Sequence, residues 1–143
     1  MISVEYNIFS PCPYKASWVT KVVGVVSKRE KKVRGVVEIN VVDKKIIKKI
    51  NWQWRGKNQV TDVLSFAWQE GSTTPGSRHL GEIYLCFEKI KEQAKEYRIT
   101  AKEEFARMLV HGLLHLVGYD HVRPLEAKKM FKKQEKIIKE CLS

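Results

Sequence analysis

The sequence predicts a small α+β domain in which a mixed sheet of about four strands packs with about five helices. Segments rich in β-branched and aromatic residues alternate with amphipathic helical segments in the order β-α-β-α-β-β-α-α-α. This order fits an α/β or an α+β domain, and we adopt α+β. At 143 residues, with 43% hydrophobic and 30% charged residues, the chain has the size and composition of one globular domain with its own core.

The strands are predicted from short runs of residues that suit a half-buried pleated surface, such as "VVEINVV" and "EIYLCF". We expect four of them: Ile2–Phe9, Val33–Val42, Asp62–Trp68 and Leu80–Phe87. Residues 69–79, "QEGSTTPGSRH", have no apolar periodicity and predict a loop, in which His79 is expected to be an ordinary loop histidine.

The first two helices are predicted from apolar residues at helical spacing. Tyr14–Arg29 places Trp18 and several valines on one face. Asp43 is a suitable cap for the next helix. In that helix Ile46, Ile47, Ile50 and Trp54 are expected on one side, with lysines on the other.

Three more helices follow in the second half of the chain. After Glu88–Arg98, the capping box Thr100-x-x-Glu103 starts a helix with an apolar run from Phe105 to Val117. Pro124 suits the first turn of the last helix. Its buried stripe is expected to comprise Met130, Phe131, Ile137, Ile138 and Cys141.

The net charge of +11 is concentrated in patches. Five of the seven residues in "KREKKVR" (28–34) are basic, and residues 44–60 contain six basic residues and no acidic one. Such surfaces attract polyanions, because neutralised phosphates release counterions. A solvated lysine-rich face is the simpler reading, but the size of the charge excess favours nucleic acid as the partner.

Three cysteines, far apart and without a C-x-x-C pair, indicate reduced thiols and argue against a disulfide framework or a cysteine zinc site. The first residues lack a secretory signal, and no apolar run reaches the roughly 18 residues of a membrane span. We therefore expect a cytoplasmic protein without membrane attachment.

The segment "HGLLHLVGYDH" (111–121) contains three of the four histidines. His111 and His115 are four residues apart and project from the same face of one helix. Gly118 allows the left-handed turn that ends this helix, so His121 can reach back as a third ligand. Three imidazoles leave one tetrahedral position open for water, which is typical of catalytic zinc. We therefore predict one zinc ion per chain.

Gly112 stands where zinc peptidases with this histidine spacing have a glutamate that serves as general base. Glycine cannot deliver a proton to a leaving amine, whereas zinc alone lowers the pKa of bound water to about 7. A phosphodiester has an anionic transition state that rewards a cation, and Arg55 lies in a basic segment just before a strand. The residues therefore favour attack of a metal-bound water on a phosphodiester over peptide hydrolysis.

Taken together, "LVHGLLHLVGYDH", "INWQWRGKNQVTDVLSF" and "HLGEIYLC" strongly resemble the YbeY family of bacterial metal-dependent single-strand endoribonucleases. The resemblance covers most of the chain, from about Val33 to His121. It implies a zincin-like (metalloprotease-like) α+β fold in a single catalytic domain (residues 1–143). It also implies action on ribosomal RNA precursors, at the 3′ end of small-subunit rRNA, and a role in ribosome maturation.

Matched position by position, the resemblance makes His111, His115 and His121 the zinc ligands, and Arg55 and His111 the residues needed for RNA cleavage. For the signature residues around the third strand, the sequence favours a structural role at least as much as a catalytic one. These residues are Asn51, Thr61, Asp62, Ser65 and Phe66. The chain departs from the family at Glu82, where aspartate is common. It also departs at Ala67, where proline is usual, so the resemblance does not predict the turn after the third strand.

Two alternatives remain open at this point. One is a zinc peptidase or amidase, which the histidine spacing supports and Gly112 opposes. The other is a ribosome-associated RNA-binding assembly factor in which the metal only secures the fold. Arg55 itself could be a packing residue stacked on a tryptophan face, without a catalytic part.

Overall fold

The computed structural model describes residues 1–31, 33–68, 79–119 and 121–143. Four strands form one mixed sheet: β1 (Ile2–Ile8), β2 (Gly35–Val41), β3 (Val63–Ala67) and β4 (His79–Leu85). Their spatial order is β1-β2-β4-β3. The first three strands in this order are parallel, while β3 pairs antiparallel with β4 and forms one edge of the sheet. The prediction of a mixed four-stranded sheet is confirmed.

In the described part of the chain five helices accompany the sheet, as predicted: α1 (Ala16–Arg29), α2 (Lys44–Arg55), α3 (Phe87–Tyr97), α4 (Ala101–Leu116) and α5 (Pro124–Leu142). The two predicted caps are present, since the Asp43 carboxylate accepts from the Ile46 amide at 2.8 Å and the Thr100 hydroxyl from the Glu103 amide at 3.1 Å. The elements follow the expected order and make an α+β fold. Residues 69–78 of the expected loop lie outside the described residues, and so does the turn expected after Ala67.

One face of the sheet carries the main core. Side chains that alternate along the strands, such as Val37, Ile39 and Ile83, pack there against α1, α3, α4 and α5. α4 is the central helix of this layer, and Phe105, Leu109 and Leu113 on it are almost fully buried. This burial fixes the position of the helix that carries two of the histidines.

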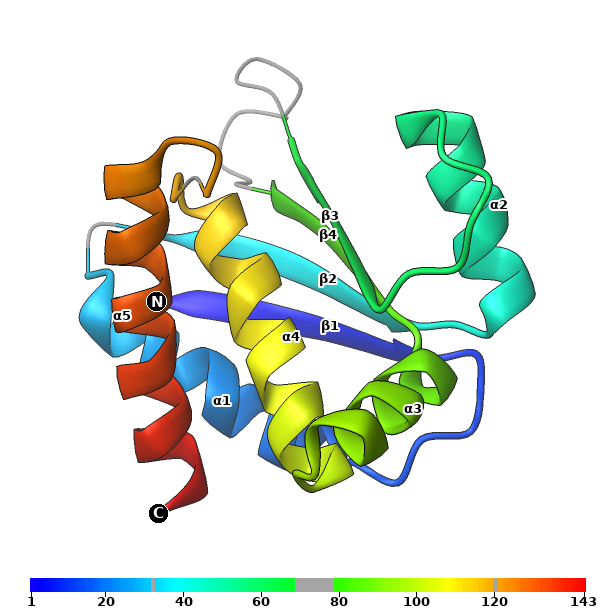
Figure 1. The fold of residues 1–143 in the computed structure, drawn as a ribbon. Coiled ribbons are helices and arrows are strands. Elements are labelled where there is room, and N and C mark those ends of the chain that lie inside the picture. Colours follow the sequence, from blue (N-terminus) through cyan, green and yellow to red (C-terminus); the bar gives the residue numbers. More distant parts are fainter. Residues whose placement is uncertain (32, 69–78, 120) are drawn as a thin grey trace.

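On the opposite face α2 packs against the β3–β4 edge, and this helix stands apart from the other four helices of the described residues (Figure 1). A small second core forms between this helix and the β3–β4 edge, around Ile47, Leu64 and Cys86. The expectation that Ile46 and Trp54 join the buried side is wrong, because Ile46 is 40% and Trp54 67% exposed. The helix meets the sheet along a narrow strip, so residues flanking Ile47 stay outside the contact.

Among the described residues, no helix combines the length and apolar character that a membrane crossing requires.

Candidate metal centre and adjoining cleft

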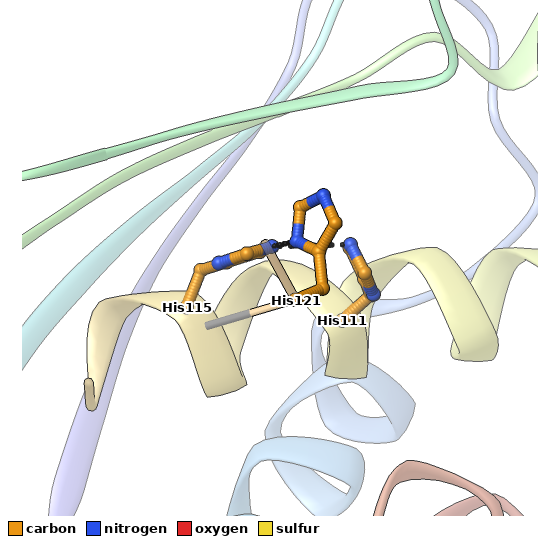
Figure 2. Close-up of side chains that lie close together, drawn as sticks. All are labelled: His111, His115 and His121. Atoms are coloured by element: carbon orange, nitrogen blue, oxygen red, sulfur yellow. Dashed lines mark hydrogen bonds between the residues drawn. The ribbon is translucent and has the colours of Figure 1, made fainter. Parts of the chain in front are cut away.

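The three histidines of the predicted metal site converge at the C-terminal end of α4 (Figure 2). His115 Nε2 lies 3.2 Å from His111 Nε2 and 2.9 Å from His121 Nδ1. Two nitrogens bound to one tetrahedral zinc ion, at bond lengths of about 2.0–2.1 Å, are about 3.3 Å apart. The spacing of the imidazoles therefore fits a single metal ion with three nitrogen ligands.

The turn that brings His121 back to the helix has the hydrogen bonds of a Schellman motif. Gly118, at φ +107°, follows the helix, and its amide donates to the His115 carbonyl at 3.1 Å. The Tyr119 amide donates to the Leu114 carbonyl at 3.0 Å. A positive φ favours glycine, so the predicted helix-ending role of Gly118 is confirmed.

Tyr119 fixes this turn to the rest of the fold through its hydroxyl group. The hydroxyl donates to Glu30 Oε1 at 2.6 Å and accepts from Lys133 Nζ at 2.6 Å. Lys133 also pairs with Glu30 at 2.5 Å. α1, α5 and the turn after α4 are thereby joined two residues before His121.

The His111 ring contacts two side chains of α5. Its Nδ1 lies 2.8 Å from Gln134 Oε1, and the Phe131 ring stacks on it at a centroid distance of 6.3 Å. Burial lowers the pKa of His111, while the hydrogen bond with Gln134 acts in the opposite direction. A neutral imidazole is the form that binds a metal ion.

The packing around Gly112 explains why no larger residue, such as glutamate, stands beside His111. A Cβ atom at this position would lie 3.2 Å from the Cγ2 atom of Ile83, in the core between α4 and β4. A larger side chain would have to displace Ile83, which is fully buried. The glycine therefore allows close packing of helix and sheet, and this position offers no general base.

Arg55 is the last residue of α2 and reaches across the free edge of the sheet. Its Nη2 donates to the Ser65 carbonyl at 2.8 Å, and its guanidinium lies 4.8 Å from the centroid of the Phe66 ring. The alternative that Arg55 stacks on a tryptophan is therefore wrong in its partner, since the aromatic ring beneath it is Phe66. Gly56, at φ +70°, ends the helix immediately after it.

Arg55 and the three histidines line one cleft of about 640 Å³. The edge strand β3 contributes Val63, Ser65 and Ala67 to its lining. One wall comes from the C-terminal end of α2 and the following residues, and the other from α4 with His121. The structure thus brings together the four residues that the sequence singled out.

The remaining signature residues hold this cleft in shape. Buried Asn51 donates to the Gln59 carbonyl at 3.0 Å. Asp62 Oδ1 accepts from the Val63 amide at 2.8 Å and lies 3.2 Å from the Thr61 hydroxyl oxygen. These contacts are structural ones, and the choice between a structural and a catalytic role for Asn51, Thr61 and Asp62 stays a prediction.

Glu82 and His79 lie on β4 and are not among the residues that line the cleft. Glu82 lies beside Glu38 of β2, and burial together with this neighbour raises its pKa. His79 is not a loop residue as expected, since it begins β4 and its ring packs on Trp68 at 4.4 Å. Its Nδ1 is buried without a hydrogen-bond partner among the described residues.

Two groups at the site were not predicted from the sequence. One is Gln134, which occupies the buried stripe of α5 beside Ile137 and Ile138, where a polar residue is unusual. The other is the Tyr119–Glu30–Lys133 cluster, which joins residues far apart in the chain. Gln134 left a usable signal, because it breaks an apolar stripe, whereas the cluster depends on the tertiary fold.

Comparison with known proteins finds relatives over most of the chain. The family model described as "Endoribonuclease YbeY" matches residues 11–142. The Endoribonuclease YbeY of Bdellovibrio bacteriovorus is 40% identical over 136 residues, covering 92% of this chain and 87% of that protein. That of Malacoplasma penetrans is 40% identical over 124 residues, covering 86% of this chain and 80% of the relative.

Other relatives are longer than the shared region. The match to the Endoribonuclease YbeY of Myxococcus xanthus, 45% identical over 105 residues, covers 73% of this chain and 36% of that protein. The match to the Ureaplasma urealyticum relative covers 65% of that protein. Among solved structures, the solution structure of TM1509 from Thermotoga maritima has a TM-score of 0.66 and 30% identity, covering 99% of this chain and 89% of that one.

Proposed function

Because the chain belongs to the YbeY family of endoribonucleases, we propose that it is a metal-dependent hydrolase that cleaves single-stranded RNA. Its substrate class would be ribosomal RNA precursors, and its action part of ribosome maturation in the cytoplasm. The observation that carries the proposal is the cleft that the three-histidine cluster, Arg55 and the edge strand line together. The three unpaired cysteine thiols support a reducing compartment.

We assign the metal to His111, His115 and His121, and zinc is the ion that three imidazoles favour. Zinc, when bound, supplies Lewis acidity and lowers the pKa of water. Arg55 would bind the scissile phosphate and offset the additional negative charge as the bond breaks. The edge strand would orient the RNA between these two positive groups, so that residues 1–143 act as one catalytic domain.

The surface beside Arg55 suits a single-stranded polyanion. Trp52 is 59% exposed on α2 and has Lys48 and Lys49 on the same side, one turn away. Exposed indole rings can stack with unpaired bases, and flanking ammonium groups can contact phosphates. The stacking contact is lost when the bases are paired with each other, because paired bases stack inside the duplex, and this supports a single-stranded substrate.

The peptidase alternative has less support. Extended peptides commonly bind by adding a strand to an exposed sheet edge. Here the Ser65 carbonyl of the edge strand already accepts from Arg55. Gly112 also leaves position 112 without a carboxylate.

The proposal is tested by incubating the protein with single-stranded RNA, with duplex RNA of the same sequence and with an unfolded protein. Each reaction is run as purified, after chelation, and after zinc is restored. We expect cleavage of single-stranded RNA alone, lost on chelation and recovered with zinc. Cleavage of the unfolded protein would favour the peptidase. Tight RNA binding without cleavage in any condition would favour the assembly factor.

A further inference from the structure

We infer that Gln134 is a positioning residue for the metal centre, one that fixes the His111 ring with its Nε2 lone pair directed at the metal. The inference rests on the proposed function, because it concerns how the chain prepares one of the metal ligands. Gln134 comes from α5 and is 4% exposed, and its Oε1 lies 2.8 Å from His111 Nδ1.

The chemistry of the amide oxygen decides which nitrogen of His111 carries the proton. A carbonyl oxygen can only accept, so Nδ1 must be the donor in this hydrogen bond. In a neutral imidazole with Nδ1 protonated, the lone pair is on Nε2. That nitrogen is the one 3.2 Å from His115 Nε2, within the histidine cluster. The contact therefore selects the tautomer that can bind a metal.

The orientation of the Gln134 amide is itself fixed by a second contact. Its Nε2 donates to Glu135 Oε2 at 3.3 Å, and a carboxylate can only accept. The Glu135 carboxylate in turn accepts hydrogen bonds from Arg107 Nη2 at 2.8 Å and from Arg107 Nε at 3.1 Å. Arg107 lies one turn before His111 on α4, so the relay closes a ring between α4 and α5.

Burial explains why this amide is more than a packing residue. Its neighbours in the buried stripe of α5 are Met130, Ile137, Ile138 and Cys141. A polar group in such a stripe destabilises the fold unless it is hydrogen-bonded, and an apolar residue of the same size would avoid that cost. The bond to His111 is what an apolar residue could not provide.

The test compares zinc dissociation constants, measured by competition with a chromogenic chelator, for three variants. Gln134→Leu keeps the volume and removes the acceptor. Gln134→Glu keeps an acceptor at the same place. Ile137→Val is the matched control, a change in the same buried stripe without a hydrogen bond to His111. We expect zinc affinity to fall roughly 10–100-fold in Gln134→Leu, and to stay close to wild type in the other two.

A second readout needs no metal and no variant. Nitrogen-15 NMR of the metal-free wild-type protein, at a pH where His111 is neutral, should show its proton on Nδ1. This measurement also decides the question if Gln134→Leu does not fold.

Three results would overturn the inference: unchanged zinc affinity in Gln134→Leu, an equal loss in Ile137→Val, or a wild-type His111 protonated on Nε2. A wild-type protein that binds no divalent metal would instead refute the proposed metal centre itself. The two failures are therefore distinguishable.

Discussion

The Arg55 guanidinium is fixed at two points, by the Ser65 carbonyl and by the face of the Phe66 ring. A planar group held this way presents its remaining N–H donors in one direction, which suits the oxygens of a phosphate. A lysine ammonium can approach the same carbonyl but cannot keep this planar arrangement. The geometry of Arg55, in addition to its charge, is therefore part of the proposed mechanism.

We predict that Arg55→Lys keeps its fold and its full zinc content but loses RNA cleavage by roughly tenfold or more. The measurements are cleavage rate, metal content and thermal unfolding on the same preparation. Arg98→Lys, at the end of α3 and outside the cleft, is the matched control. Near-normal cleavage by Arg55→Lys, with a lowered melting temperature, would mean that Arg55 only packs against Phe66.

At the scale of single residues, the sequence predicted the groups whose signal is local. The histidine spacing and the helix-ending Gly118 both depend on short-range backbone geometry, and both are found as expected. The aromatic partner of Arg55 was wrong because Phe66 lies on a strand that only the folded sheet brings beneath α2. The catalytic and metal-binding roles themselves stay predictions.

The open face of the sheet carries an acidic row. Strand register places Glu5 beside Glu38, and Glu38 beside Glu82, so three carboxylates cross neighbouring strands. Like charges directly opposite each other on a sheet are destabilising. Burial raises the pKa of Glu82, and the neighbouring Glu38 raises it further.

We predict that Glu38→Gln stabilises the protein at pH 7 by about 0.2–1 kcal/mol. A raised folded-state pKa means that the folded protein binds a proton more readily than the unfolded chain. Glu82 therefore does not lower the free energy of unfolding at pH values below its ordinary pKa, near 4.3. It lowers that free energy as the pH rises through its raised pKa. The gain should accordingly shrink at pH 4. Thermal unfolding at both pH values measures it, with exposed Glu96→Gln as control. A gain of the same size at pH 4 would rule out charge repulsion as its cause.

At the scale of elements, sequence patterns were sufficient for the order of strands and helices and for the caps at Asp43 and Thr100. Hydrophobic period and capping residues act within a few positions, so they can be read without the fold. The buried side of α2 could not be read in the same way. Its periodicity fits a helix, but how much of that face the sheet covers depends on where β3 and β4 lie.

The charge of the whole molecule, +11, sets how strongly RNA binding should respond to salt. We predict that the logarithm of the RNA association constant falls linearly with the logarithm of salt concentration. Replacing both Lys48 and Lys49 by glutamine should reduce the slope by about two, if each contacts one phosphate. Binding titrations over a range of salt concentrations provide the measurement, with Lys95→Gln on α3 as control. A flat salt response would mean that the lysines only keep the surface hydrated.

At this largest scale the sequence predicted the α+β class, while the contacts that shape the cleft needed the structure. The bonds of Gln134 to His111 and of Arg55 to Ser65 join different elements. No spacing along the chain encodes which residue of α5 meets which residue of α4. Gln134, a polar residue within an apolar stripe, is a signal in the sequence, but it does not indicate which residue of α4 it contacts.

The separate placement of α2 has a consequence for how the protein would respond to heat. This helix rests on the small core around Ile47 and Leu64, whereas α4 lies within the main core. Segments with few buried apolar contacts open at lower free energy than the molecule as a whole. Arg55 would therefore leave the cleft at temperatures at which His111 and His115, on α4, remain in place. Warming should inactivate the protein reversibly before it unfolds, with amide hydrogen exchange rising first in α2. Simultaneous exchange of α2 and α4 would show that the two cores melt together.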